Sequence, residues 1–200
     1  MNITTIGLDI AKNVFQLHGD DAHGKKDFSK RVGRTTLLRT LQQIPPCLVG
    51  LEACGGAYYW ARHIAELGHT VKLINPQFVK PYVKSNKNDP NDAEAICEAV
   101  TRPHMRFVAV KSVQQQDIQM LHKVRNKLIK DKVALSNQIR GLLLEYGIAI
   151  NQGDASLRKA LVDLSNISRT SDLTNYGQAI FQDLYEEFLN DEALIRPLQE

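Results

Sequence analysis

Several features that would assign a function at a glance are missing from this sequence. The three cysteines, Cys47, Cys54 and Cys97, are odd in number and lack the spacing of metal ligands. We therefore expect reduced thiols rather than a disulfide framework or a zinc site. The histidines are scattered along the chain and form no cluster that would compete as a metal site.

Long apolar runs are missing as well. No stretch approaches the roughly 18 consecutive apolar residues of a transmembrane helix. The start, MNITTIGLD, has neither the basic residues nor the apolar core of a signal peptide. The 200 residues are 43% hydrophobic and 24% charged, which is typical of a globular protein with a real core. We therefore expect no membrane contact and a location in the cytoplasm.

The chain has no large excess of one charge, because its net charge is only +3. The positive and negative charges are nevertheless distributed unevenly along it. Residues 171–200 are acidic, whereas residues 102–140 are basic. The basic residues of that segment are Arg102, Arg106, Lys111, Lys123, Arg125, Lys127, Lys130, Lys132 and Arg140. A basic segment of this kind suits a polyanion such as DNA or RNA. A solvated helix face explains the same pattern, and charge alone does not decide between the two.

The first half of the chain alternates between strand and helix patterns. Apolar and alternating runs predict a three-stranded meander, followed by strands that alternate with helices. The expected strands cover residues 3–10, 13–20, 27–32, 47–54 and 69–76, and the expected helices cover 35–43, 57–68 and about 91–101. This order is typical of an α/β fold, in which a mixed sheet carries helices on its faces.

The second half has a helical pattern. Leucines recur every seven residues from Leu121 to Leu142, which predicts a coiled coil or helical hairpin over 113–146. An amphipathic helix packed on its own domain is the alternative. Residues 151–175 are polar and are expected to be irregular, and 176–195 predict an acidic helix that folds back along the basic one. We therefore expect one domain over 1–110 and a helical segment over 111–200.

Two acids lie in strands that are otherwise apolar. Asp9 follows the first apolar run, and Glu52 ends the fourth expected strand within VGLEACGG. Burying an unpaired carboxylate is costly, so each acid needs a partner, a metal ion or a place at a strand end. Strands one and four are neighbours in a mixed sheet of this order, and both carboxylates would then meet at one edge.

A second pair of acids lies in KNDPNDAEA, at residues 87–95. Asp89 is a good N-cap, Pro90 fits the first helical turn, and Asp92 would meet free amides at the start of a helix. This structural role explains the pair without any chemistry. The spacing also places both carboxylates on one face of that helix.

Together the four acids predict a metal site. Asp9, Glu52, Asp89 and Asp92 would repel one another unless cations lay between them, and oxygen-rich sites suit Mg²⁺ or Mn²⁺. Two such ions activate an attacking oxygen and stabilise a leaving oxygen in phosphodiester chemistry. An actin-like ATPase also begins with an aspartate in its first strand, but we find no glycine-rich phosphate loop downstream.

Several segments closely resemble one family over about residues 3–145. They are GLDIAKNVFQLHG, LEACGGAYYWAR, the Lys-x-Asp-x-x-Asp-Ala motif of residues 87–93, and RFV at 106–108. They resemble the insertion-sequence transposases with a RuvC-like DEDD domain, which are related to the Piv invertase and described as bridge-RNA-guided recombinases. The Glu-Ala-x-Gly core of the family is present, here with Cys54 at its third position.

The resemblance implies an RNase H-like (RuvC-like) fold, in which Asp9, Glu52, Asp89 and Asp92 form a catalytic, metal-binding tetrad. It implies metal-dependent DNA strand cleavage and transfer for a mobile element, with a structured RNA as guide. It also implies a helical insertion for assembly into a dimer or tetramer. Lysines near the acids are candidates for phosphate contact, as are cations of the helical segment; solvated lysines are the alternative. These candidates are Lys12, Lys80, Lys84, Lys87, Lys123, Arg125, Lys127, Lys130 and Arg140.

The chain departs from the family at its C-terminal side. Family members carry a further domain with an IPGIG segment and a serine thought to act as nucleophile, and no such segment precedes Glu200. We therefore expect an N-terminal part whose C-terminal transposase domain is absent, and we assign the nucleophile to no serine here. Two alternatives stay open: a stand-alone metal-dependent nuclease or junction resolvase, and a non-catalytic module for nucleic-acid binding and oligomerisation.

Overall fold

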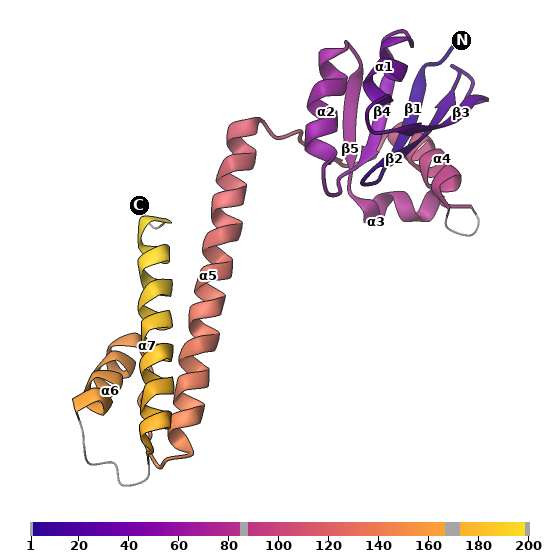
Figure 1. Ribbon diagram of the computed structural model, residues 1–200. Coiled ribbons are helices and arrows are strands. Elements are labelled where there is room, and N and C mark those ends of the chain that lie inside the picture. Colours follow the sequence, from indigo (N-terminus) through magenta and orange to yellow (C-terminus); the bar gives the residue numbers. More distant parts are fainter. Residues whose placement is uncertain (1, 85–87, 167–172, 199–200) are drawn as a thin grey trace. The chain divides into compact units, whose positions relative to one another are not determined.

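The computed structural model describes residues 2–84, 88–166 and 173–198. The chain divides into two compact units, Met1–Ser112 and Val113–Glu200 (Figure 1). The first unit is built on a β-sheet and the second is helical. Each unit has its own buried apolar core, so each is described by itself.

One mixed sheet of six strands organises the first unit. Its strands are β1 (Thr5–Ile10), β2 (Val14–Asp20), β3 (Lys26–Gly33), β4 (Leu48–Glu52), β5 (Thr70–Ile74) and β6 (Phe107–Val108). They lie in the order β3-β2-β1-β4-β5-β6. β1, β2 and β3 form an antiparallel meander, β4 and β5 run parallel to β1, and β6 is antiparallel to β5. This is an α/β, RNase H-like arrangement, and it confirms the expected fold class.

Helices cover both faces of this sheet (Figure 1). α1 (Leu37–Gln42) and α2 (Ala57–Glu66) pack on the face that carries Ile6 and Leu8 of β1, where the main apolar core lies. α4 (Asp89–Val100) packs on the opposite face. The short helix α3 (Pro76–Val79) and the 3-10 helix η1 (Lys80–Tyr82) connect β5 to α4 on that second face.

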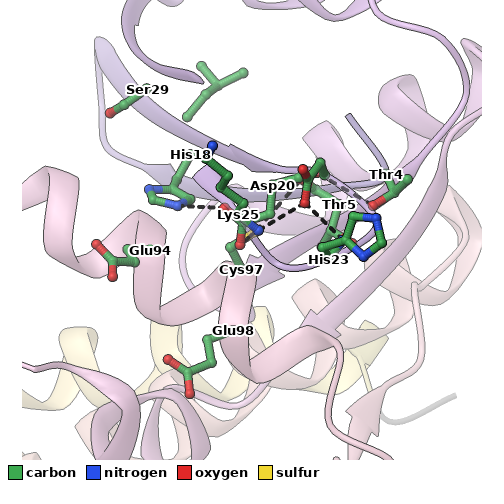
Figure 2. A network of polar contacts seen from close by, with 12 residues as sticks. Thr4, Thr5, His18, Asp20, His23, Lys25, Ser29, Glu94, Cys97 and Glu98 are labelled. Carbon is green, nitrogen blue, oxygen red and sulfur yellow. Dashed lines mark hydrogen bonds and ion pairs between the residues drawn. The ribbon is translucent and has the colours of Figure 1, made fainter. Parts of the chain in front are cut away.

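The sheet face under α4 carries polar side chains from β2. His18 and Asp20 alternate with apolar residues along that strand, and the Nε2 atom of His18 lies 3.0 Å from a carboxylate oxygen of Asp20. The other carboxylate oxygen of Asp20 accepts a hydrogen bond from the Cys97 thiol of α4 at 3.4 Å. Figure 2 shows these three side chains together, with Glu94 and Glu98 on the same helix. The buried polar groups are therefore satisfied by one another.

Two of the three cysteines are buried in the first unit, and this predicts a loss of stability in alkali. Burial raises the pKa of the Cys47 thiol from 9.0 to about 11. Burial, together with the charge of Asp20, raises the pKa of Cys97 as well. A raised folded-state pKa means that the stabilisation is complete below pH 9.0 and is lost as the pH rises through the folded-state value.

We expect Cys47 to contribute roughly 1 kcal/mol of pH-dependent destabilisation by about pH 10, because only the unfolded chain ionises there. Urea unfolding of the wild type and of Cys47→Ala, at neutral and at alkaline pH, measures how steeply the free energy of unfolding falls with pH in each protein. Cys54→Ala is compared with it and should change the pH dependence less, since Cys54 is only half-buried. Equal slopes for the wild type and Cys47→Ala would contradict the prediction.

The second unit is a bundle of helices. It contains α5 (Val113–Leu144), α6 (Asp154–Asn166), α7 (Asn175–Ile195) and the 3-10 helix η2 (Arg196–Leu198). Ile139 of α5, Leu157 of α6 and Phe188 of α7 are fully buried in its core. The Lys132 amine of α5 lies 2.6 Å from Asp154 and 3.6 Å from Glu192, so one cation joins all three helices. Arg158 pairs with the same Glu192 at 2.7 Å.

The structure differs from the sequence-based expectations at four places. Residues 151–175 were expected to be irregular, yet α6 forms within them because Leu157, Leu161 and Leu164 share one helix face. α4 begins at Asp89 rather than at about residue 91, and α3, η1 and β6 were not expected. The heptad also shifts: Leu135, Ile139 and Leu143 are buried, whereas Leu142 is 40% exposed. The packed face near the end of α5 therefore follows spacings of four, whereas the seven-residue repeat predicted Leu142 on that face.

The helices of residues 2–84, 88–166 and 173–198 were also compared with the length and hydropathy that a bilayer requires. None of them is long enough and apolar enough to cross a membrane.

Candidate metal and DNA-cleavage site

Asp9 lies near the end of β1, on the sheet face that α4 covers. Side chains alternate along a strand, so Asp9 shares this face with Gly7, whereas Leu8 points into the main core. Asp9 is half-buried, unlike the fully buried Leu8. The acid is thus placed at the sheet edge, where the strand leaves the core.

Glu52 occupies the matching position on the neighbouring strand. β1 and β4 are parallel, with Gly7 opposite Gly50 and Leu8 opposite Leu51. The next step of this register brings Asp9 beside Glu52 on the same face, at the usual strand spacing of about 4.8 Å. The structure therefore brings together the two acids that the sequence placed in separate strands.

Two glycines let α4 approach this face closely. A Cβ atom on Gly7 would lie 2.0 Å from the Ala93 carbonyl oxygen and 2.4 Å from the Cys97 amide nitrogen. A Cβ atom on Gly50 would lie 2.8 Å from the Cβ atom of Val100. Each glycine is two residues before an acid, so the pattern Gly-x-acid occurs in both strands. That pattern is a sequence signal for the helix contact that the sequence analysis did not use.

The direction of α4 brings its N-terminal acids toward Asp9 and Glu52. Cys97 lies against Thr5, near the start of β1, and Ala93 lies against Gly7, so α4 runs antiparallel to β1. From Gly7 to Asp9 the strand advances about 6.6 Å. From Ala93 back to Asp89 the helix covers about 6 Å, so Asp89 reaches the level of Asp9.

Asp92 has the same relation to the second strand. It precedes Ile96 by one helical turn, and Ile96 faces Gly50, two residues before Glu52. Asp92 is half-buried, whereas Asp89 is exposed. All four acids therefore lie toward one end of the β1–β4–α4 layer, in two pairs from different elements.

The capping role expected for Asp89 belongs to another residue. Asn88 is the N-cap of α4, with extended backbone angles, and its side-chain oxygen accepts a hydrogen bond from the Asn91 amide at 2.9 Å. Asp89 is consequently the first residue of the helix and Asp92 the fourth. Neither carboxylate is needed as the cap, which weakens the purely structural explanation of the pair.

The thiol of Cys54 lies close enough to Glu52 and Asp9 for their charges to affect its pKa. Burial raises the pKa of its thiol first, and the negative charges of Glu52 and Asp9 raise it further. Both carboxylates therefore act on one sulfur atom just after β4. This thiol environment was not anticipated from the sequence, where Cys54 only interrupts the family pattern.

The donor set suits a hard divalent cation, because it consists of carboxylates. Among the residues that the structure describes, no three acidic, histidine or cysteine side chains are gathered closely enough to hold one ion. Like charges without a cation between them favour separated side chains. Within the described residues, the acids of α4 and those of the strands therefore form no closed set of ligands.

The cations predicted near this site differ in their surroundings. Lys12 and Lys80 are exposed, and Lys12 follows Asp9 by three residues. Lys84 is held by Glu94 and Glu98 of α4, each at 3.1 Å, and hydrogen bonds to these acids, Glu98 first, raise its pKa. Lys84 is therefore less suited to a phosphate than expected, and Lys87 lies outside the described residues.

The cations of α5 also fall into two groups. Lys123, Lys127 and Lys130 are exposed and share one helix face through spacings of four and three, and Lys127 pairs with Asp131 at 2.5 Å. Arg125 is half-buried on another face. Arg140 donates from its Nη2 atom to the Gly153 carbonyl at 2.9 Å, which joins α5 to the start of α6. Arg140 therefore has a structural contact, and the lysine stripe is the better candidate for a polyanion.

Comparison with known proteins adds independent information. A family model of the IS110-type DEDD group, described as a transposase, matches residues 6–148. The chain is 46% identical to a probable family 20 transposase of Pseudomonas aeruginosa, over 100% of this chain and 59% of the relative. It is 43% identical to the transposase for insertion sequence element IS1328 of Yersinia enterocolitica, over 94% of this chain and 55% of the relative.

A third relative is the transposase for insertion sequence element IS1111A of Coxiella burnetii. The identity is 47%, over 96% of this chain and 53% of the relative. The chain thus spans between about half and three-fifths of the length of these curated relatives.

Proposed function

Because this chain belongs to the IS110-type DEDD transposase family, we propose that its acidic edge binds Mg²⁺ or Mn²⁺ and cleaves and transfers DNA strands of a mobile element. The proposed ligands are Asp9 and Glu52 from the sheet and Asp89 and Asp92 from α4. When bound, the ions would activate the attacking oxygen and stabilise the leaving oxygen. The carboxylates orient the site, and the sheet and helix hold them on rigid elements.

One observation supports this proposal most. Gly7 and Gly50 allow α4 to lie directly on β1 and β4, and this contact sets both pairs of acids at the same end of the layer. A core built only for stability would fill these positions with apolar side chains. Instead, glycines precede two acids in adjacent strands, and the capping role at α4 is taken by Asn88.

Titration calorimetry with Mn²⁺ tests the site. We expect the wild type to bind Mn²⁺ and the Asp89→Asn/Asp92→Asn variant to lose this binding, because half of the ligand set is neutralised. Asp27→Asn, on the exposed part of β3, is the matched control and should bind like the wild type. Equal binding by the double variant would return Asp89 and Asp92 to a structural role at the start of α4.

The proposed partners are DNA and a structured guide RNA. The exposed lysine stripe of α5, formed by Lys123, Lys127 and Lys130, supports a polyanion contact. Each lysine that contacts a phosphate releases counterions, so the affinity falls steeply with salt. The stripe lies in the helical unit, so this contact is tested separately from the acidic edge.

Removing two of these lysines should reduce the salt dependence of binding. We expect Lys123→Gln/Lys130→Gln to lower the slope of log affinity against log salt by about 2 for duplex DNA. Fluorescence anisotropy over a salt series, with duplex DNA and a folded RNA as separate probes, measures the slopes. Lys159→Gln, an exposed lysine of α6, is the control, and an unchanged slope in the double variant would exclude the stripe.

We also propose that copies of the chain associate through α5, as a dimer or tetramer. Ile118, Leu121 and Val124 are 56%, 43% and 47% exposed, and they form an apolar stripe toward the N-terminal end of that helix. Exposed apolar rows of this kind favour helix pairing.

A second candidate function is a module for nucleic-acid binding and assembly. The exposed lysines Lys123 and Lys130 and the exposed apolar residues of α5 favour this candidate. Nucleic-acid binding without Mn²⁺-dependent cleavage would support this candidate. Nicking of branched DNA by the chain without any RNA would instead indicate a nuclease or junction resolvase.

A further inference from the structure

A mostly apolar pocket lies between the α3–η1 segment and the segment that links α4 to β6, and it has no role in the proposed metal site. Its volume is about 430 Å³. Phe78, Tyr82 and Met105 supply its apolar wall, and Arg102, His104 and Arg106 contribute cationic or titratable groups. None of the described residues that line it is an aspartate or a glutamate. A pocket of this size holds a small organic group, and its polarity favours an anionic one.

The apolar wall is anchored to the core of the first unit. Phe78 belongs to α3, Tyr82 to η1, and Met105 to the segment between α4 and β6. All three side chains are half-buried and pack against the cluster that contains Ile74 and Ile96. The rings are thus held in place on one side and offer their remaining surface to the pocket.

Cations are arranged around these rings. The Arg102 guanidinium lies 5.6 Å from the centroid of the Tyr82 ring, and it pairs with Glu98 of α4. It is therefore oriented before any ligand arrives. Arg106 and His104 are exposed, and among the described residues neither has a hydrogen bond or an ion pair. These two side chains remain available for a phosphate.

The sheet register places the pocket near the acids. Glu52 of β4 is opposite Ile74 of β5, which is opposite Phe107 of β6, the residue after Arg106. Two strand spacings therefore separate Glu52 from Phe107, which is about 10 Å. Ile74 shares the sheet face of Glu52, so the pocket wall and the acids lie on one face. A DNA strand with one phosphate at the acids would therefore reach the pocket within a few nucleotides.

We propose that this pocket binds one unpaired nucleotide of the DNA strand that is cleaved at the acidic edge. The base would lie against Tyr82 and Phe78, and its phosphate would contact Arg106 and His104. Aromatic rings and arginine planes bind the faces of unpaired bases, whatever their sequence. A base stacked within a duplex cannot enter, so the pocket selects strands that are already separated. This inference rests on the proposed function.

Binding of single-stranded DNA in EDTA tests the pocket independently of any metal. The probe is labelled oligothymidylate of about twelve nucleotides, compared with an abasic oligomer of equal length. We expect the wild type to bind the thymidylate roughly tenfold more tightly than the abasic oligomer. Tyr82→Leu, which keeps an apolar side chain on the core, should remove most of this ratio. Tyr59→Leu, on an exposed tyrosine of α2, should keep it.

The contact is mapped with a thymidylate oligomer that carries 5-iododeoxyuridine. We expect photo-crosslinks within residues 78–82 or 102–106. Three results would each overturn the proposal. The first is a thymidylate-to-abasic affinity ratio that is unchanged in Tyr82→Leu, and the second is crosslinks confined to α5. The third is a preference for bases over abasic sites that is seen with RNA oligomers but not with DNA. Loss of Mn²⁺ binding does not alter these measurements, so failure of the metal site and failure of the pocket are distinguishable.

Discussion

Asp9→Asn is expected to reduce Mn²⁺-dependent DNA strand cleavage on the order of a thousandfold, because a carboxylate that holds the ions is replaced by a neutral amide. The position favours a large effect. The parallel register of β1 and β4, which pairs Leu8 with Leu51, places Asp9 and Glu52 at neighbouring strand positions, so each contributes a carboxylate to the same end of the sheet. Cleavage of DNA that carries an end of the mobile element, with a structured RNA present and at fixed Mn²⁺, measures the loss.

The same substitution should have the opposite effect on stability without metal. Like charges on adjacent strands are unfavourable, so Asp9→Asn should raise the free energy of unfolding by about 0.5 kcal/mol in EDTA. Added Mn²⁺ should raise the melting temperature of the wild type and leave that of Asp9→Asn nearly unchanged.

Asp27→Asn is the control for both measurements, because this acid lies on the exposed part of β3. An equal Mn²⁺-induced shift in Asp9→Asn and the wild type would show that Asp9 is not a ligand. A loss of stability in EDTA would indicate instead that the Asp9 carboxylate supports the fold.

Gly7→Ala is expected to destabilise the first unit by about 3 kcal/mol, at the upper end of overpacking effects. The added Cβ atom would meet the Ala93 carbonyl oxygen at 2.0 Å and the Cys97 amide nitrogen at 2.4 Å. Both contacts are with backbone, so a side-chain rotation cannot relieve them. α4 must move away from β1, and it carries Asp89 and Asp92 with it.

Urea unfolding measures the loss, and calorimetry with Mn²⁺ measures the effect on the site. Gly33→Ala is the matched control, because its nearest neighbour would be the Thr36 hydroxyl at 3.8 Å. Gly50→Ala should be intermediate, since its closest contact is the Val100 side chain at 2.8 Å. If Gly7→Ala were as stable as Gly33→Ala, α4 would not lie against Gly7 closely enough to exclude a Cβ atom.

Local patterns were sufficient for the regular elements. Alternating side chains identify β1 and β2, and the apolar runs that end at Glu52 and Pro76 identify β4 and β5, because strands and helices have different periods. Short elements did not follow from such patterns. β6 has two residues and α3 has four, which is too little sequence to show a period.

Competing local signals caused the errors at helix starts. Asn88 and Asp89 are both good caps, and the chain uses Asn88, so α4 begins earlier than expected. In residues 151–175 the polar composition suggested a linker, yet three leucines on one face were enough for α6 to pack against the other helices. Tertiary packing therefore outweighed composition there.

The four acids themselves, and the metal chemistry suited to them, follow from residue types and their order along the chain. Their arrangement does not, because it depends on contacts between distant segments. The pairing of β1 with β4 sets Asp9 beside Glu52, and the glycines let α4, which starts with Asp89 and Asp92, pack directly on these strands. The pocket of Phe78, Tyr82 and Arg106 likewise combines three separate elements. Strand register and helix docking are non-local, and only folding of the whole unit determines them.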